Sequence, residues 1–188
     1  EYRGPIEIIV MDDSDENEKT AAKTAAVEAD VDPDLLSKMY LRPNQNLIYQ
    51  HLHERVTVGE KRNMACTLSK GEIIIMMDDD DIYHPNRIPY QIQPILNGNA
   101  DMTVLQQDIW LQLYPGDIRK ESKFFKATPR MAQSVHYGTL AFRKTVWDPS
   151  RDLVYTNASL FDEVDFYKKV KDDEGIIVQE LSNNGMHV

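Results

Sequence analysis

Four consecutive aspartates, Asp78, Asp79, Asp80 and Asp81, directly follow an apolar run at residues 73–77. The run has the length and composition of a strand buried on both faces, so the aspartates stand where that strand leaves the core. Four adjacent carboxylates repel one another, and here they would do so beside an apolar interior. A bound divalent cation would offset this repulsion, because carboxylate oxygens suit Mg²⁺, Mn²⁺ or Ca²⁺; a solvated acidic loop is the alternative.

Apolar, strand-like runs alternate with helical patterns along the chain. The expected strands cover residues 6–11, 47–52, 73–77, 138–142 and 176–178, and the expected helices cover residues 20–29, 60–69, 86–97 and 160–170. Residues 102–113 alternate loosely, and the polar residues 117–137 are expected to form a long loop or a lid. This order predicts the α/β class, with a mostly parallel central sheet flanked by helices. Parallel strands would bring Asp12 and Asp13, which end the first strand, to the same sheet edge as residues 78–81.

Composition excludes several classes of protein. Lys and Arg number 21 against 31 Asp and Glu, a net charge of −10, so no nucleic-acid partner is expected. The run at residues 73–77 is the longest uninterrupted apolar run and is far too short for a membrane span. A single cysteine, Cys66, excludes an internal disulfide and a multi-cysteine zinc site, and it favours a reducing, cytoplasmic location. The first residues also lack the pattern of a signal peptide.

Residues 58–88 contain a distinctive series of motifs. They comprise Gly59, then Lys61, Arg62 and Asn63 in a predicted helix, then Lys70, Gly71 and Glu72 before an apolar strand, an Asp-x-Asp motif at its end, and Pro85. This stretch resembles the central part of GT-A glycosyltransferases, particularly the inverting enzymes of family 2. Residues 9–14 resemble the family's first acidic motif, and residues 138–170 give a weaker match. The resemblance implies one GT-A catalytic domain over residues 1–188, with the family's first strand missing from the sequence.

The resemblance also implies a UDP-sugar site. The family's first acidic motif contacts the nucleobase, which points to Asp13 with Asp12 as its neighbour. Arg62 matches a position that approaches the nucleotide, and Lys61 beside it would serve the diphosphate.

In the family's Asp-x-Asp motif an early carboxylate holds the ribose hydroxyls and a later one binds the metal, here Mn²⁺ or Mg²⁺. Four aspartates leave the register ambiguous. We assign the ribose to Asp78 or Asp79 and the metal to Asp80, with Asp81 as an alternative or indirect ligand. His187 is a further candidate ligand, because several GT-A enzymes place a metal-binding histidine near this point of the chain.

Inverting transfer needs a base that takes the proton of the acceptor hydroxyl. Residues 160–170 resemble the family's Glu-Asp motif at a helix start, which places Glu163 at the base position and Asp162 beside it, in swapped order. An acidic first turn that merely stabilises a helix N-terminus is the alternative. Trp110 and His136 border the polar region and are candidate acceptor-side contacts, because aromatic faces stack on sugar rings.

The expected function is therefore metal-dependent, inverting transfer from a UDP-sugar donor to a hydroxyl of a glycan or glycoprotein acceptor. Two alternatives stay open. One is a non-catalytic glycan- or Ca²⁺-binding module on the same scaffold. The other is a phosphoryl-transfer enzyme, because Asp78 and Asp80 after a strand superficially resemble a haloacid-dehalogenase motif. No particular oligomeric state is predicted.

Overall fold

The chain forms two compact units. The computed structural model describes residues 2–14, 41–78, 81–107, 109–112, 123–126 and 134–187, with the backbone alone for 109–112 and 123–126. We call the first of the two units the sheet unit; it comprises Glu1–Tyr2, Glu72–Leu153 and Glu163–Val188. We call the second the N-terminal unit; it comprises Arg3–Gly71 and Val154–Asp162.

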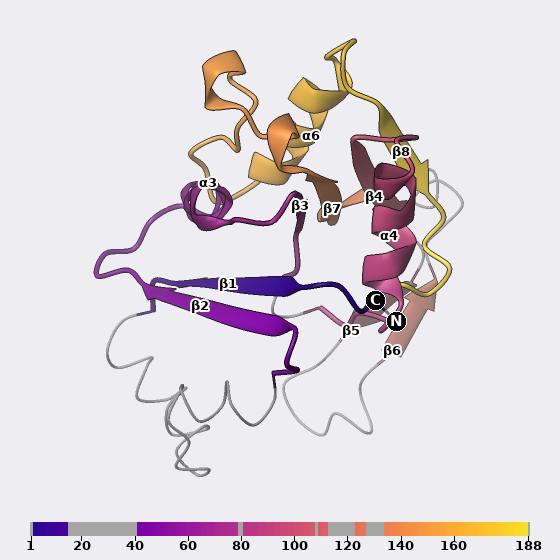
Figure 1. The fold of residues 1–188 in the computed structure, drawn as a ribbon, viewed down its shortest axis with the longest axis horizontal. Coiled ribbons are helices and arrows are strands. Elements are labelled where there is room, and N and C mark those ends of the chain that lie inside the picture. The colour runs from indigo at the N-terminus through magenta and orange to yellow at the C-terminus, as the bar shows by residue number, and fades with distance from the viewer. Residues whose placement is uncertain are drawn as a thin grey trace. The chain divides into compact units, whose positions relative to one another are not determined.

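A four-stranded sheet forms the centre of the sheet unit (Figure 1). Its order is β3 (Ile73–Ile75), β7 (Val135–Arg143), β4 (Met102–Gln106) and β8 (Val178–Leu181). β7 pairs antiparallel with both β3 and β4, and β4 pairs parallel with β8. Three strands therefore run one way and β7 runs the other, so β7 begins at the edge where β3, β4 and β8 end. We call this edge the carboxyl edge.

The α/β class is as expected, but the sheet is mixed rather than mostly parallel. Among the described strands, parallel pairing joins β1 to β2 and β4 to β8, and the other pairs are antiparallel. The expected loop at residues 117–137 also contains strand: β6 (Lys123–Lys126) pairs antiparallel with β5 (Ile109–Gln112), and β7 begins at Val135. An apolar run predicts a strand, but its pattern reads the same whether the strand runs parallel or antiparallel to its neighbours.

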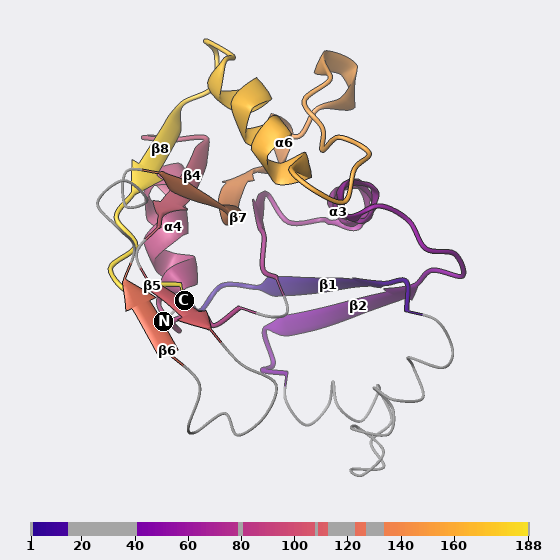
Figure 2. The ribbon, with the colours of Figure 1, turned by 180° about the vertical axis from the view of Figure 1, so that it is seen from behind.

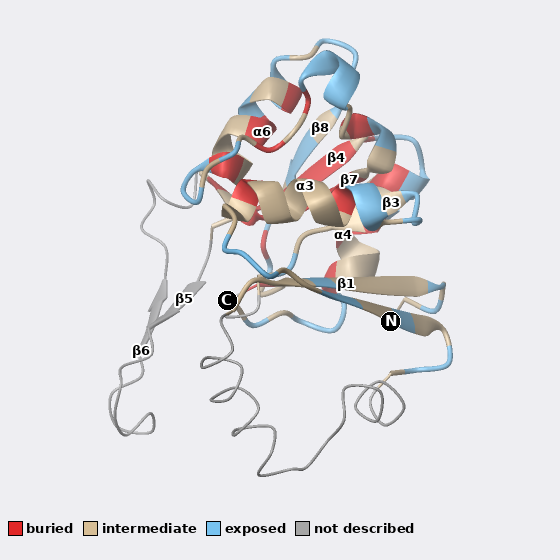
Figure 3. Cartoon of the chain, turned by 90° about the vertical axis from the view of Figure 1, so that its left-hand side faces the viewer, coloured by how far each residue is buried: buried red, intermediate tan, exposed pale blue. Residues whose placement is uncertain are grey.

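The core lies in the sheet unit, where β4 and β7 carry most of the buried strand positions (Figure 3). All residues from Met102 to Leu105 are fully buried, which requires cover on both faces of the sheet. Helix α4 (Arg87–Leu96) packs on β4 and β7. Helix α6 (Asp162–Lys171) places Phe166 against Phe142, with ring centroids 5.3 Å apart.

Two short 3₁₀ helices, Lys144–Val146 and Pro149–Arg151, follow β7. Within the described ranges, no helix combines the length and the apolar character needed to cross a bilayer.

The N-terminal unit contains β1 (Ile6–Asp12), which pairs parallel with β2 (Gln45–His51) (Figure 2). Helix α3 (Val58–Leu68) packs against β1 and begins after Thr57, whose hydroxyl accepts a hydrogen bond from the Glu60 N–H at 3.2 Å. The apolar run at residues 6–11 would suit a strand buried on both faces, but β1 is half-buried and Val10 is exposed. In the described part of the unit β1 has a single strand partner, which leaves its other edge without a neighbouring strand.

Gly59, in the first turn of α3, has no room for a side chain. A Cβ there would lie 1.9 Å from the Thr156 carbonyl oxygen and 3.1 Å from the Asp162 Cβ. We expect Gly59→Ala to lower the free energy of unfolding by roughly 3 kcal/mol, because displaced backbone outweighs the gain of about 1 kcal/mol in helix propensity. Urea denaturation measures the change. Gly175→Ala is the control, since a Cβ there meets only the Asp173 side chain; equal stabilities of the two variants would contradict the prediction.

Candidate functional site

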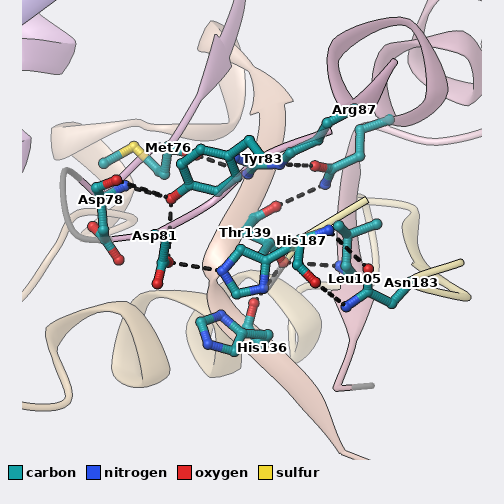
Figure 4. Close-up of polar contacts among 11 residues, drawn as sticks. Met76, Asp78, Asp81, Tyr83, Arg87, Leu105, His136, Thr139, Asn183 and His187 are labelled. Carbon is teal, nitrogen blue, oxygen red and sulfur yellow. Dashed lines mark hydrogen bonds and ion pairs between the residues drawn. The ribbon is translucent and has the colours of Figure 1, made fainter. Parts of the chain in front are cut away.

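Three side chains that can bind a metal converge at the carboxyl edge of the sheet (Figure 4). They are Asp81, His136 and His187, and one ligand atom of each lies within 4.8 Å of those of the others. Asp81 follows β3, His187 follows β8, and His136 is the second residue of β7. The antiparallel direction of β7 is what brings His136 to the edge where the other two strands end.

His187 and Asp81 already face each other. The His187 Nε2 atom lies 2.8 Å from Asp81 Oδ2, and His187 is only 4% exposed. The side chain of Asn183 holds the His187 backbone at both polar atoms: Asn183 Oδ1 accepts from the N–H at 3.0 Å, and Asn183 Nδ2 donates to the carbonyl at 3.1 Å. Tyr83 and His187 also form an antiparallel bridge, so the histidine is fixed before any ligand binds.

His136 completes the cluster, with its ring centroid 4.2 Å from that of His187. Burial, assisted by the neighbouring His187, lowers the pKa of His136 to about 4. Its imidazole is therefore neutral at pH 7 and keeps a lone pair for a metal or a hydrogen bond. Gly138 makes the space: a Cβ there would lie 2.6 Å from Asp78 Oδ2 and 3.3 Å from His136 Cε1. A carboxylate and two imidazoles are donors that fit a divalent metal.

Tyr83 contacts both Asp78 and Asp81 in the segment that follows β3, a role that no motif of the sequence indicated. Its hydroxyl accepts a hydrogen bond from the Asp78 N–H at 2.7 Å. The same oxygen lies 3.2 Å from the Asp78 carbonyl and 3.2 Å from Asp81 Oδ2, either of which accepts its single proton. Burial raises the pKa of Tyr83, with the nearby aspartates adding to the rise, so the hydroxyl stays protonated and able to donate.

Arg87, also missed, is a fully buried cation beneath this segment. Its Nη2 donates to the Met76 carbonyl at 2.8 Å and its Nε donates to Gln91 Oε1 at 2.7 Å. The guanidinium carbon lies 4.3 Å from the centre of the Tyr83 ring. Arg87 interacts electrostatically with Asp78 and Asp81, so the protein itself supplies part of the positive charge that the acidic run requires. A signal was present in the sequence, since Arg87 and Gln91 are one helical turn apart on the face that also carries Ile95.

The N-terminal unit pairs two of the predicted nucleotide-binding residues. Lys61 Nζ lies 2.8 Å from Asp13 Oδ1, while Asp13 Oδ2 accepts from the Val56 N–H at 3.2 Å. The hydrogen bond from Lys61 is the main reason that the pKa of Asp13 is lowered. Asp12 accepts from the Ser14 N–H at 2.9 Å and from the Tyr49 hydroxyl. Burial alone would raise the pKa of Asp12, but these hydrogen bonds outweigh it and lower the value to about 2.

Arg62, expected at the nucleotide, forms an ion pair with Asp162. Arg62 Nη1 lies 2.8 Å from Asp162 Oδ2, and Asp162 is 1% exposed. The guanidinium also lies 5.8 Å from the centre of the Tyr155 ring. Asp162 is therefore committed to a buried ion pair and is poorly placed to exchange protons with a substrate.

Glu163, the second residue of α6, is half-buried in the sheet unit. Its carboxylate acts electrostatically on His136, working to raise the pKa of that histidine. This interaction places Glu163 near the cluster at the carboxyl edge. Asp79 and Asp80 lie outside the described residues, so the ribose assignment of Asp79 and the metal assignment of Asp80 remain predictions. Trp110 lies in β5, where the backbone alone is described.

The sequence matches the model of glycosyl transferase family 2 over residues 2–136. No curated protein matches the sequence. The fold is similar to that of S. aureus TarS residues 1–349, with a TM-score of 0.59 and 16% identity over 97% of this chain and 59% of that chain. TarS 1–349 in complex with UDP-GlcNAc gives a TM-score of 0.56 at 16% identity, covering 97% of this chain and 57% of that chain. The corresponding complex with UDP gives 0.58 at 16% identity, with 97% and 59% covered. The chain thus spans less than two thirds of the length of these structures, and the likeness shows the expected GT-A fold.

Proposed function

Since the chain belongs to glycosyl transferase family 2, we propose that it transfers a sugar from a UDP-sugar to a hydroxyl of a glycan or glycoprotein. The transfer would invert the configuration of the anomeric carbon and would use Mn²⁺ or Mg²⁺. The main support is the convergence of Asp81, His136 and His187 at the carboxyl edge, with Glu163 in electrostatic reach of the same cluster. The TarS structures in complex with UDP-GlcNAc and with UDP support a UDP-sugar as the class of donor.

The metal site would be formed by His187 together with Asp80 and Asp81. A divalent ion bound there would neutralise the charge that develops on the departing nucleoside diphosphate. Tyr83 and Arg87 hold the segment that carries the aspartates, through the hydroxyl contacts with Asp78 and Asp81 and the bond to the Met76 carbonyl. These contacts hold Asp78 and Asp81, the first and last residues of the acidic run.

The nucleobase would be contacted by Asp13, and the diphosphate would be contacted by Lys61. Asp13 stays ionised because of Lys61, and an ionised carboxylate can accept the N3–H of uracil. Lys61 supplies a local positive charge in a protein whose net charge is −10 and whose overall field would repel a diphosphate. Asp12 lies next to Asp13 in the same acidic motif, and Arg62 lies next to Lys61 at a position expected to approach the nucleotide. Asp78 would bind the ribose hydroxyls.

Glu163 would act as the base. It would take the proton of the acceptor hydroxyl as that oxygen attacks the anomeric carbon from the face opposite the leaving group. Asp162, its neighbour, would serve a different purpose: its ion pair with Arg62 ties the start of α6 to α3. The two carboxylates of the swapped motif therefore divide into one reactive group and one structural group.

The two alternative functions are less well supported. A Ca²⁺-binding module would favour oxygen donors, whereas two of the three converging side chains are imidazoles. Membership of glycosyl transferase family 2 favours sugar transfer over phosphoryl transfer.

Calorimetric titration of UDP, with Mn²⁺ and with EDTA, tests the proposal. We expect UDP to bind about tenfold more tightly with Mn²⁺, because an ion held by Asp80, Asp81 and His187 would offset the negative charge of the diphosphate. ADP is the control ligand, since adenine does not offer the N–H that Asp13 would accept, and it should bind more weakly. Mn²⁺ binding without any affinity for UDP would favour the non-catalytic module, and would count against the transferase.

A further inference from the structure

We propose that His136 is a direct ligand of the metal, and that its imidazole, together with that of His187, makes the site selective for Mn²⁺ and other transition-metal ions over Mg²⁺. The inference rests on the proposed metal-dependent function. It goes further by adding a ligand that the sequence assigned to the acceptor side, and by naming the class of ion that the site prefers.

The spacing of the three side chains suits a shared ion. Donors about 2.1 Å from one ion lie about 3 Å apart when adjacent and about 4.2 Å apart when opposite. The Asp81 and His187 ligand atoms are 2.8 Å apart, which matches adjacent positions. All three ligand atoms lie within 4.8 Å of one another, so His136 is close enough for a side-chain rotation to bring it into the same shell.

The backbone of His136 is held rigidly, as a metal ligand requires. His136 stands opposite Leu105 in the register of β7 and β4, and its carbonyl accepts from the Thr139 hydroxyl at 2.6 Å. Gly138 leaves room for the ring, since a Cβ there would lie 3.3 Å from His136 Cε1. A stacking platform for a sugar would have to expose a ring face, whereas the His136 ring is packed against His187 with centroids 4.2 Å apart. Ligation therefore fits this histidine better than a contact with the acceptor.

Donor chemistry determines the preferred ion. Mg²⁺ binds oxygen donors and gives up its water reluctantly, and nitrogen donors add little to its binding. Imidazole binds transition-metal ions well, and affinity rises from Mn²⁺ along the first-row series. A site with two imidazoles among its donors should therefore discriminate against Mg²⁺, although the acidic run alone would accept it.

The test counts the histidine nitrogens bound to Mn²⁺. Electron spin-echo envelope modulation of the Mn²⁺-loaded protein should show two imidazole nitrogens in the wild type and one in His136→Gln. His53→Gln is the matched control, because His53 is an exposed histidine of the N-terminal unit, and it should keep both. Calorimetry should show that His136→Gln weakens Mn²⁺ binding by about tenfold or more. The same variant should change Mg²⁺ binding by less than about twofold.

One bound nitrogen in the wild type, or two in His136→Gln, would overturn the assignment of His136 without affecting the proposed transferase. Two nitrogens in the wild type without any affinity for UDP would support the His136 ligand and count against the transferase. If His136→Gln does not fold, the count in the wild type decides the question: two metal-bound histidine nitrogens, counted with ¹⁵N-labelled histidine, support the assignment, and one overturns it.

Discussion

Glu163→Gln is expected to lower the turnover of a UDP-sugar by about 10²- to 10⁴-fold, because the amide has the shape of the carboxylate but cannot accept a proton from the attacking hydroxyl. Slow hydrolysis of UDP-sugars, in which water replaces the acceptor, measures the change in kcat. The affinity for UDP with Mn²⁺ should stay within about twofold of the wild type, since Glu163 acts on the acceptor rather than on the nucleotide.

Asp162→Asn is the control for this prediction, and the structure gives it a different outcome. The substitution leaves Arg62 without its carboxylate partner at a nearly buried site, which should lower the free energy of unfolding by roughly 2 to 4 kcal/mol. The folded fraction should keep most of its turnover. The roles of the two residues would be reversed if folded Asp162→Asn lost turnover while Glu163→Gln retained it.

Asp81→Asn is expected to weaken Mn²⁺ binding by about 10- to 100-fold and to lower UDP-sugar turnover by a similar or larger factor. Asparagine keeps an oxygen that can accept from Tyr83, 3.2 Å away in the wild type, so the loop should stay in place. What the variant loses is the negative charge beside His187. Calorimetry with Mn²⁺ and the hydrolysis assay measure the two effects separately.

Two further variants make this result specific. Asp172→Asn removes the same charge from an exposed site of the sheet unit and should behave as the wild type. Asp80→Asn tests the register of the acidic run, because the sequence assigned the metal to Asp80. Loss of Mn²⁺ binding in Asp80→Asn with full binding in Asp81→Asn would contradict a role for Asp81 as a ligand.

Much of the local structure could be predicted from the sequence. The helix expected at residues 60–69 is α3 (Val58–Leu68), and the helix expected from residue 86 is α4 (Arg87–Leu96), which is followed by Gly98 with a φ of +73°. The strand before the aspartates is β3, but it is half-buried rather than buried on both faces, and Met77 after it is exposed. The motifs at residues 58–88 identified the family, and the match over residues 2–136 confirmed it.

The candidate site was predicted less completely. The acidic run and His187 pointed to a metal, and the structure places Asp81 and His187 in contact. The contribution of Arg87 to the charge balance could not be predicted, because a buried arginine with hydrogen-bonded partners is rare and a helical arginine usually faces solvent. His136 was assigned to the acceptor side because a histidine beside a polar stretch gives no indication of its neighbours in space.

What the sequence determined by itself was local: which segments are apolar enough to be strands, where acidic residues end them, and which family's motifs they carry. Tertiary structure decided which of these residues meet. Asp81 and His187 are 106 positions apart, and they touch because β3 and β8 end at the same edge. His136 joins them because β7 runs the opposite way. Strand direction depends on backbone hydrogen bonds between distant segments, and the side-chain pattern of a single segment does not encode it.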